Sequence, residues 1–153
     1  MSRCALPLLA LVSGCTSPAI DWAPQSISSE GATWALRQFA GKQVKRSDPE
    51  AATVRFLADH KTVGTSACND VGGEELTWSA DASGEHGAIN HDQTRGTITT
   101  VVRCSSISAV QLGNCFWADM IKARAWSTTA TTLTIEFADR SEARLARVTR
   151  NGS

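Results

Sequence analysis

LTIEFADRSEARLARV, residues 133–148, is the clearest strand pattern in the chain. Apolar and polar side chains alternate over residues 133–137 and again over residues 143–148, as in β-strands that bury one face. The intervening residues 138–141, ADRS, have the composition of a tight turn. The pattern therefore predicts an antiparallel hairpin near the end of the chain.

Shorter runs of the same kind precede this hairpin, separated by Gly, Asp and Ser. Residues 59–61 are an expected hairpin turn between two of these runs. The other expected strands are residues 33–39, 53–58, 62–66, 76–79, 87–90, 96–102 and 125–128. Many short strands with close turns predict a mainly β (α+β) fold, a small antiparallel β-barrel or curled sheet with one helix.

One segment, residues 108–124, has helical rather than alternating spacing. Its apolar positions are Phe116, Trp117, Met120 and Ile121. Gly113 and Asn114 interrupt the segment, so Asn114 is the expected N-cap of a shorter helix. Lys122 and Arg124 lie near the expected C-terminal end of this helix, where positive charges stabilise the helix dipole. We therefore expect a single helix before the last three strands.

The composition is that of one globular domain without an electrostatic preference. The 153 residues include 15 basic and 15 acidic side chains, and their 42% hydrophobic content excludes a disordered chain. The basic residues are scattered, with only Lys45 and Arg46 adjacent, whereas nucleic-acid binding needs a clustered basic face. Nucleic acid is therefore not an expected partner.

The N-terminus has the pattern of a secretory signal. Arg3 precedes an apolar run over residues 5–11, which is too short to span a membrane. The following VSGC, residues 12–15, resembles a bacterial lipobox, in which the cysteine receives the lipid. We therefore expect residues 1–14 to be a lipoprotein signal peptide and Cys15 to be lipidated. The alternative is a chance cysteine after an apolar N-terminus.

A lipidated cysteine predicts a domain that is tethered to a membrane, because several acyl chains on one residue give stable anchoring. Residues 15–31 contain Pro18 and Pro24 among polar side chains, so we expect a lipidated tether before a domain over residues 32–150. The residue after Cys15 is Thr16 and not aspartate, and the absence of aspartate at this position favours the outer membrane. The expected location is the bacterial cell envelope, facing the periplasm, with the membrane as a partner.

Taken in order, these segments resemble the META domain family, which includes the heat-shock protein HslJ. The matching features are Trp34-x-Leu36, a small-residue stretch over 64–73 with Cys68-Asn69, Thr-x-x-x-Cys at 100–104, a helix with Phe116 and Met120, and closing strands at 133–135 and 145–148. The resemblance covers about residues 34–148. The chain departs from the family at Val71, where an aromatic residue is usual, over 101–103, where the family is Met-rich, and over 112–114, where the family has glutamate.

The resemblance implies a barrel-like α+β fold, export to the envelope, and a link to stress or antibiotic tolerance. The family has no established enzymatic activity, so we expect a non-catalytic protein without catalytic residues or a cofactor. One alternative is an interaction module, such as a lysozyme inhibitor, for which residues 105–108 (SSIS) are the only hint of an inserting plug. The other is a carrier of small apolar ligands, which needs an open cavity.

Three cysteines follow Cys15, namely Cys68, Cys104 and Cys115. In an oxidising envelope they suggest one disulfide and one free thiol, with three pairings possible, while three reduced thiols are an alternative. The family positions put Cys68 and Cys104 at strand ends near one rim, so the resemblance favours this pairing, with Cys104–Cys115 second. No His lies near any of these cysteines in the sequence, so a catalytic thiol is not expected.

Two polar clusters are weak candidates for metal binding. They are His86, His91 and Asp92, and Asp70, Glu74 and Glu75. The first lacks zinc-like spacing and the second lacks the alternation of a calcium loop, so a solvated loop and a turn are expected instead. No metal ligand is predicted.

The five tryptophans favour a packed core over a ligand cavity. Four of them, Trp34, Trp78, Trp117 and Trp126, lie in expected strands or the expected helix. We expect these four to be buried against one another or other apolar residues. Trp22 lies in the tether, where it is expected at the lipid interface.

Overall fold

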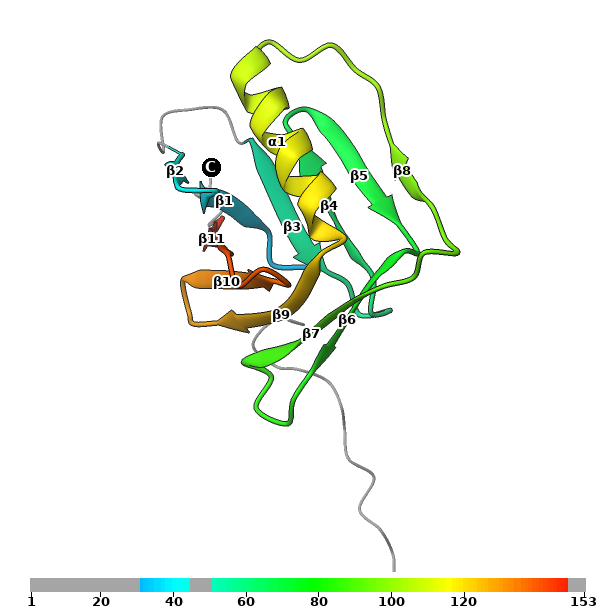
Figure 1. The fold of residues 1–153 in the computed structure, drawn as a ribbon, viewed down its shortest axis with the longest axis vertical. Helices are drawn as coiled ribbons and strands as arrows, with labels where there is room; N and C mark the ends of the chain where they lie inside the picture. Colours follow the sequence, from blue (N-terminus) through cyan, green and yellow to red (C-terminus); the bar gives the residue numbers. More distant parts are fainter. Residues whose placement is uncertain (1–30, 45–50, 149–153) are drawn as a thin grey trace, which may run out of the picture.

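The structure is a computed structural model that describes residues 31–44 and 51–148. Over these residues the chain forms a curled antiparallel sheet with one helix packed against it (Figure 1). The elements are β1 (Trp34–Phe39), β2 (Lys42–Gln43), β3 (Ala52–Phe56), β4 (Thr62–Ser66), β5 (Asn69–Gly73), β6 (Leu76–Ala80), β7 (His86–His91), β8 (Thr97–Thr99), α1 (Ile107–Met120), β9 (Ala123–Thr128), β10 (Thr132–Phe137) and β11 (Glu142–Arg147). No helix in this part of the chain has the length and apolar character needed to cross a membrane.

The sheet follows one path, β6-β7-β9-β10-β11-β1-β3-β4-β5-β8, and β2 pairs with β1 outside it. The path curls until β6 meets the turn between β3 and β4. There Lys61 forms an isolated bridge with Thr77, and the Trp78 indole N–H donates to the Leu57 carbonyl at 2.9 Å. The prediction of a mainly β fold with a curled sheet and one helix is confirmed.

The C-terminal hairpin pairs as its alternation predicts. In the β10–β11 pair, Leu133 lies opposite Leu145 and Ile135 lies opposite Ala143. All four side chains are buried, because a strand period of two residues directs them to the same face of the sheet. The expected turn at residues 59–61 likewise joins β3 to β4 in an antiparallel pair.

The strands around β5 differ from the sequence prediction. Residues 69–73, which we did not expect to form a strand, pair with β4 on one side and β8 on the other. Their sequence, NDVGG, has low β propensity, so the neighbouring strands rather than local preference hold it extended. The strand predicted over 96–102 is shortened to β8, whose ladder with β5 pairs residues 97–99.

The helix begins earlier than predicted. Its N-cap is Ser106, whose hydroxyl accepts a hydrogen bond from the Ala109 N–H at 3.3 Å, and the predicted cap Asn114 lies inside the helix. Gly113 does not interrupt α1. A Cβ atom there would lie 2.1 Å from the Ala51 carbonyl oxygen, so this glycine allows the helix to approach the sheet closely.

The helix also ends earlier than predicted. Met120 is its last residue, and no basic residue lies in its last turn. Lys122 follows the helix and contacts the Asp119 carboxylate at 2.5 Å, while Arg124 lies in β9. The positive charges that we expected at the helix C-terminus are therefore outside the helix.

Aromatic side chains fill the interior of the curled sheet. The four tryptophans expected in the core are all buried, which confirms that prediction. Phe56 packs against the rings of Trp78 and Trp126 at centroid distances of 5.5 Å, and Phe116 from α1 lies 5.6 Å from Phe39. Trp22, expected at a lipid interface, lies outside the described residues.

Candidate binding surface

Exposed large apolar side chains gather in one part of the described chain. They are Ile98, Val101, Val102, Ile107 and Ile121, and we call this set the apolar rim. The most exposed is Val101, with 96% of its surface accessible. Ile98 lies in β8, Val101 and Val102 lie in the connection to α1, Ile107 is the first residue of α1, and Ile121 comes directly after α1. Figure 1 shows these elements. Such a concentration of apolar surface marks an interaction site more often than scattered exposed residues do.

The rim lies in an almost uncharged stretch of sequence. From residue 97 to residue 118 the only charged side chain is Arg103. No other stretch of this length in the described chain has so few charged residues, although the shorter run 125–135 has none. The surface formed by β8, its connection and the outer face of α1 is therefore poorly suited to permanent exposure to water.

A disulfide and one asparagine hold the connection in place. Cys68 and Cys104 form a disulfide with their Cα atoms 5.6 Å apart, the pairing that the family resemblance favoured. The Asn69 side chain accepts a hydrogen bond from the Val102 N–H at 2.6 Å and donates one to the Val102 carbonyl at 3.3 Å. We call the disulfide and Asn69 together the Cys-Asn clamp. It satisfies the backbone of Val102 while the apolar side chains of the connection face solvent.

A cleft of about 390 Å³ separates β8 from α1. Thr97 and Thr99 line its β8 side, and Trp117 and Ile121 line its α1 side. Ser66 and Asn114 also line it, and the Ser66 hydroxyl donates to the Asn114 carbonyl oxygen at 2.6 Å. The cleft therefore combines hydroxyl and amide groups with the apolar side chains of Val71, Trp117 and Ile121.

Glu75 also lines this cleft. Its side chain is partly buried, and its carboxylate forms no ion pair or hydrogen bond with any residue in the described ranges. The neighbouring Glu74, in contrast, pairs with Lys61 and Arg95. A partly buried carboxylate without an ion-pair partner favours a ligand with a positive charge.

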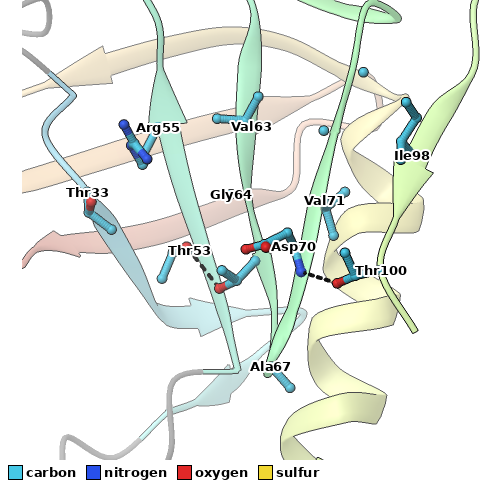
Figure 2. Close-up of a pocket in the computed structure, with 13 residues that line it drawn as sticks. Thr33, Thr53, Arg55, Val63, Gly64, Ala67, Asp70, Val71, Ile98 and Thr100 are labelled. Atoms are coloured by element: carbon cyan, nitrogen blue, oxygen red, sulfur yellow. Dashed lines mark hydrogen bonds between the residues drawn. The ribbon is translucent and has the colours of Figure 1, made fainter. Parts of the chain in front are cut away.

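A second, larger groove of about 730 Å³ lies on the opposite side of β8, over β3, β4 and β5 (Figure 2). Hydroxyl groups line it: Thr53 and Thr65 lie within hydrogen-bond distance, 2.9 Å, and the Thr100 hydroxyl accepts from the Asp70 N–H at 2.8 Å. Arg55 is exposed at its edge. The two faces of β8 thus line different hollows. Ile98 and Thr100 line the larger groove, and Thr97 and Thr99 line the cleft.

The acidic residues singled out in the sequence do not form one site. Asp70 lies in β5 and lines the larger groove, whereas Glu75 lines the cleft and Glu74 is held in ion pairs. His86 and His91 are the two ends of β7 rather than parts of a loop. Within residues 31–44 and 51–148, no group of three or more His, Cys, Asp or Glu side chains could hold a metal ion.

Asp92 illustrates how these polar residues stabilise turns. Its carboxylate accepts hydrogen bonds from the Thr94 hydroxyl at 2.6 Å and the Thr94 N–H at 2.9 Å. These bonds, with the nearby Arg95 guanidinium, lower the pKa of Asp92 below its ordinary value. The carboxylate therefore stays ionised and closes the loop between β7 and β8.

The remaining predicted site residues have separate places. Cys115 is a free, exposed thiol on α1. Ser106, within the stretch suggested as an inhibitory plug, caps α1 instead of protruding. Cys15 and the expected signal peptide lie outside the described residues. The sequence prediction missed the apolar rim, although a run of 22 residues with a single charge could have indicated it.

A family model and a solved structure resemble this chain over most of its length. A family model described as the META domain matches residues 26–151. An NMR structure of a protein from Burkholderia xenovorans is 16% identical, covers 97% of this chain and 100% of its own, and has a TM-score of 0.53, a likeness in fold alone. A crystal structure of a DUF4847 family protein from Bacteroides vulgatus is 14% identical over 79% of this chain and 94% of its own, with a TM-score of 0.46. A search of curated proteins finds no significant match.

Proposed function

Because the chain belongs to the META domain family, we propose that it is a non-catalytic bacterial envelope lipoprotein that binds a partner through the apolar rim. The observation that carries this proposal is the location of the rim. All large apolar side chains exposed within the described residues lie between Ile98 and Ile121, and one of them, Ile121, lines the cleft beside β8. A role in envelope stress or antibiotic tolerance follows from the family resemblance.

The Cys-Asn clamp supports a binding role. A partner that orders a flexible loop must offset the conformational entropy that the loop loses. Here the disulfide and the two Asn69 hydrogen bonds already hold the connection before any partner arrives. Pre-organised apolar side chains therefore bind with less entropic cost.

The disulfide also supports export. Disulfides persist in oxidising compartments such as the bacterial periplasm and are rare in the cytosol. In our proposal the lipobox-like VSGC at residues 12–15 carries the lipid on Cys15, and 15 residues lie between Cys15 and Gly31, where the described residues begin. A chain of that length reaches at most about 55 Å, enough for the domain to work near a membrane.

Metabolic labelling tests the anchoring directly. Bacteria that express the full chain are grown with an alkyne-modified palmitate, and the protein is analysed without reduction by intact and peptide mass spectrometry. We expect acylation on a chain beginning at Cys15, together with a peptide that joins Cys68 to Cys104. Cys15→Ser should abolish acylation.

Cys115→Ser is the matched control, because it removes an exposed thiol on α1. It should leave the acylation unchanged. An unmodified chain beginning at Met1, with three free thiols after residue 15, would exclude the lipoprotein role.

A carrier of small apolar ligands is the second candidate, favoured by the cleft beside Trp117 and Ile121. The interior of the sheet is occupied by aromatic side chains, so a ligand would bind in this cleft. Saturable fluorescence enhancement of the dye 1-anilinonaphthalene-8-sulfonate, abolished by Ala118→Trp on α1, is the expected result for a carrier. Dye binding that Ala118→Trp leaves unchanged would exclude it.

A further inference from the structure

We propose that the free edge of β8 and the cleft between β8 and α1 bind an extended segment of a partner protein, which adds a strand to the sheet. The segment would place apolar side chains and one lysine or arginine on the face of the sheet that carries the cleft. This inference names the class of partner for the binding surface proposed above. Its test does not depend on lipidation, so the two can fail separately.

The free edge follows from the pairing of β8 with β5. The Thr100 N–H donates to the Asp70 carbonyl at 3.1 Å, so these two residues form a hydrogen-bonded pair. Bonded and non-bonded pairs alternate in an antiparallel ladder, so Ile98 also bonds to β5. Thr97 and Thr99 therefore direct their N–H and C=O groups away from the sheet.

No described residue covers that edge. β8 is the last strand of the sheet path, and none of the described residues hydrogen-bonds to the outward backbone groups of Thr97 and Thr99. Natural edges are usually protected by Lys, Pro or a bulge. The sequence of residues 97–102, TITTVV, contains neither Lys nor Pro and is rich in β-branched residues. It is therefore a template for a further strand.

The cleft defines which side chains such a strand would carry. In a hydrogen-bonded antiparallel pair, opposite residues project to the same face. Residues of the partner opposite Thr97 and Thr99 would thus project to the face of the sheet on which these two threonines line the cleft. The unpaired carboxylate of Glu75 in the same cleft would attract a positively charged side chain.

Two other occupants fit these observations less well. A bilayer surface would leave the outward N–H and C=O groups of Thr97 and Thr99 without hydrogen-bond partners, which is costly in lipid. A second copy paired through β8 would supply no basic residue from that strand to Glu75, because residues 97–99 are Thr, Ile and Thr. An extended segment with a basic residue provides both hydrogen-bond partners for the backbone of Thr97 and Thr99 and a positive charge for Glu75.

The probe is the synthetic peptide acetyl-SVTKTVS-amide, whose second and sixth residues are valine and whose fourth is lysine. It is titrated into the isotopically labelled full chain carrying Cys15→Ser, and amide NMR shifts report the site. We expect saturable shifts at Thr97, Thr99 and Val101 and at Trp117. Methylating the backbone nitrogens of the second, fourth and sixth residues should abolish binding, since these nitrogens face β8, whereas methylating those of the third and fifth should not.

The charge requirement has its own variants. Glu75→Gln should weaken binding of the lysine peptide by about threefold to tenfold. It should also abolish the preference for lysine over a peptide with glutamate at the fourth position. Glu85→Gln, which removes the same charge from an exposed loop, is the matched control and should bind like the unsubstituted chain.

Several results would overturn the proposal. Shifts confined to the groove around Arg55, equal binding of both methylated peptides, or no saturable shift at millimolar peptide would each exclude strand addition at β8. Concentration-dependent dimers by sedimentation, with β8 shifts in the absence of peptide, would identify a second copy as the occupant. Flotation of the peptide-free chain with anionic phosphatidylglycerol vesicles, abolished by Val101→Asp, would identify a lipid surface.

Discussion

Removing the Cys68–Cys104 disulfide should lower the free energy of unfolding by about 4 kcal/mol. The two cysteines are 36 residues apart, and closing a loop of that length removes chain entropy from the unfolded state in proportion to the logarithm of its length. The native fold should persist, because domains of this size are typically stable by about 5–15 kcal/mol. The double variant Cys68→Ala/Cys104→Ala makes the change.

Urea unfolding, followed by the fluorescence of the buried tryptophans, measures the effect. The midpoint should fall, and the slope of free energy against urea should rise, because the unfolded chain exposes more surface without the cross-link. Reducing the unsubstituted protein should reproduce the loss. Cys115→Ala, which removes only an exposed thiol, should change stability by less than about 0.5 kcal/mol.

A loss below about 1 kcal/mol in the double variant would refute the entropic reasoning. It would mean that residues 68–104 remain largely ordered when the rest of the chain unfolds. A loss of several kcal/mol in the Cys115 control would refute it as well, because that thiol closes no loop.

Three further predictions follow from individual contacts. Gly113→Ala should cost at least about 1 kcal/mol in urea unfolding, because the added methyl group collides with the sheet and outweighs the gain in helix propensity. Asn69→Ala should lower stability by about 1–2 kcal/mol and speed hydrogen exchange of the Val102 amide, whereas unchanged exchange would contradict the clamp. The Ser141 hydroxyl and N–H donate to the Asp139 carboxylate and lower the pKa of Asp139, so Ser141→Ala should raise this pKa in an NMR titration. The stabilisation from these bonds is present at neutral pH and disappears as the pH falls through the lowered pKa. An unchanged pKa in the variant would refute this reasoning.

Strand and core predictions succeeded where local periodicity was sufficient. The alternation over residues 133–148 predicts both the hairpin and its buried face, because a strand directs successive side chains to opposite sides whatever it packs against. Likewise, the spacing of Phe116 and Met120 is enough to place these residues on the buried face of a helix.

The boundaries of α1 could not be predicted because they depend on contacts with distant residues. Gly113 and Asn114 have the composition of a break, yet the first packs against the Ala51 carbonyl and the second accepts a hydrogen bond from Ser66. These contacts favour the helix at positions where local preference is weak. The same reason explains β5, whose poor strand formers are held by β4 and β8.

The order of the sequence motifs alone indicated the family. The sequence alone also predicts a lipid anchor on Cys15, since the peptidase recognises a short motif in an unfolded part of the chain. The binding surface depends on the tertiary structure. Residues 96–102 are rich in β-branched residues, as a buried strand would be, and only the position of β8 at the end of the sheet exposes Ile98 and the edge beside it. Periodicity shows which side chains share a face, but what covers that face is decided by parts of the chain far away in sequence.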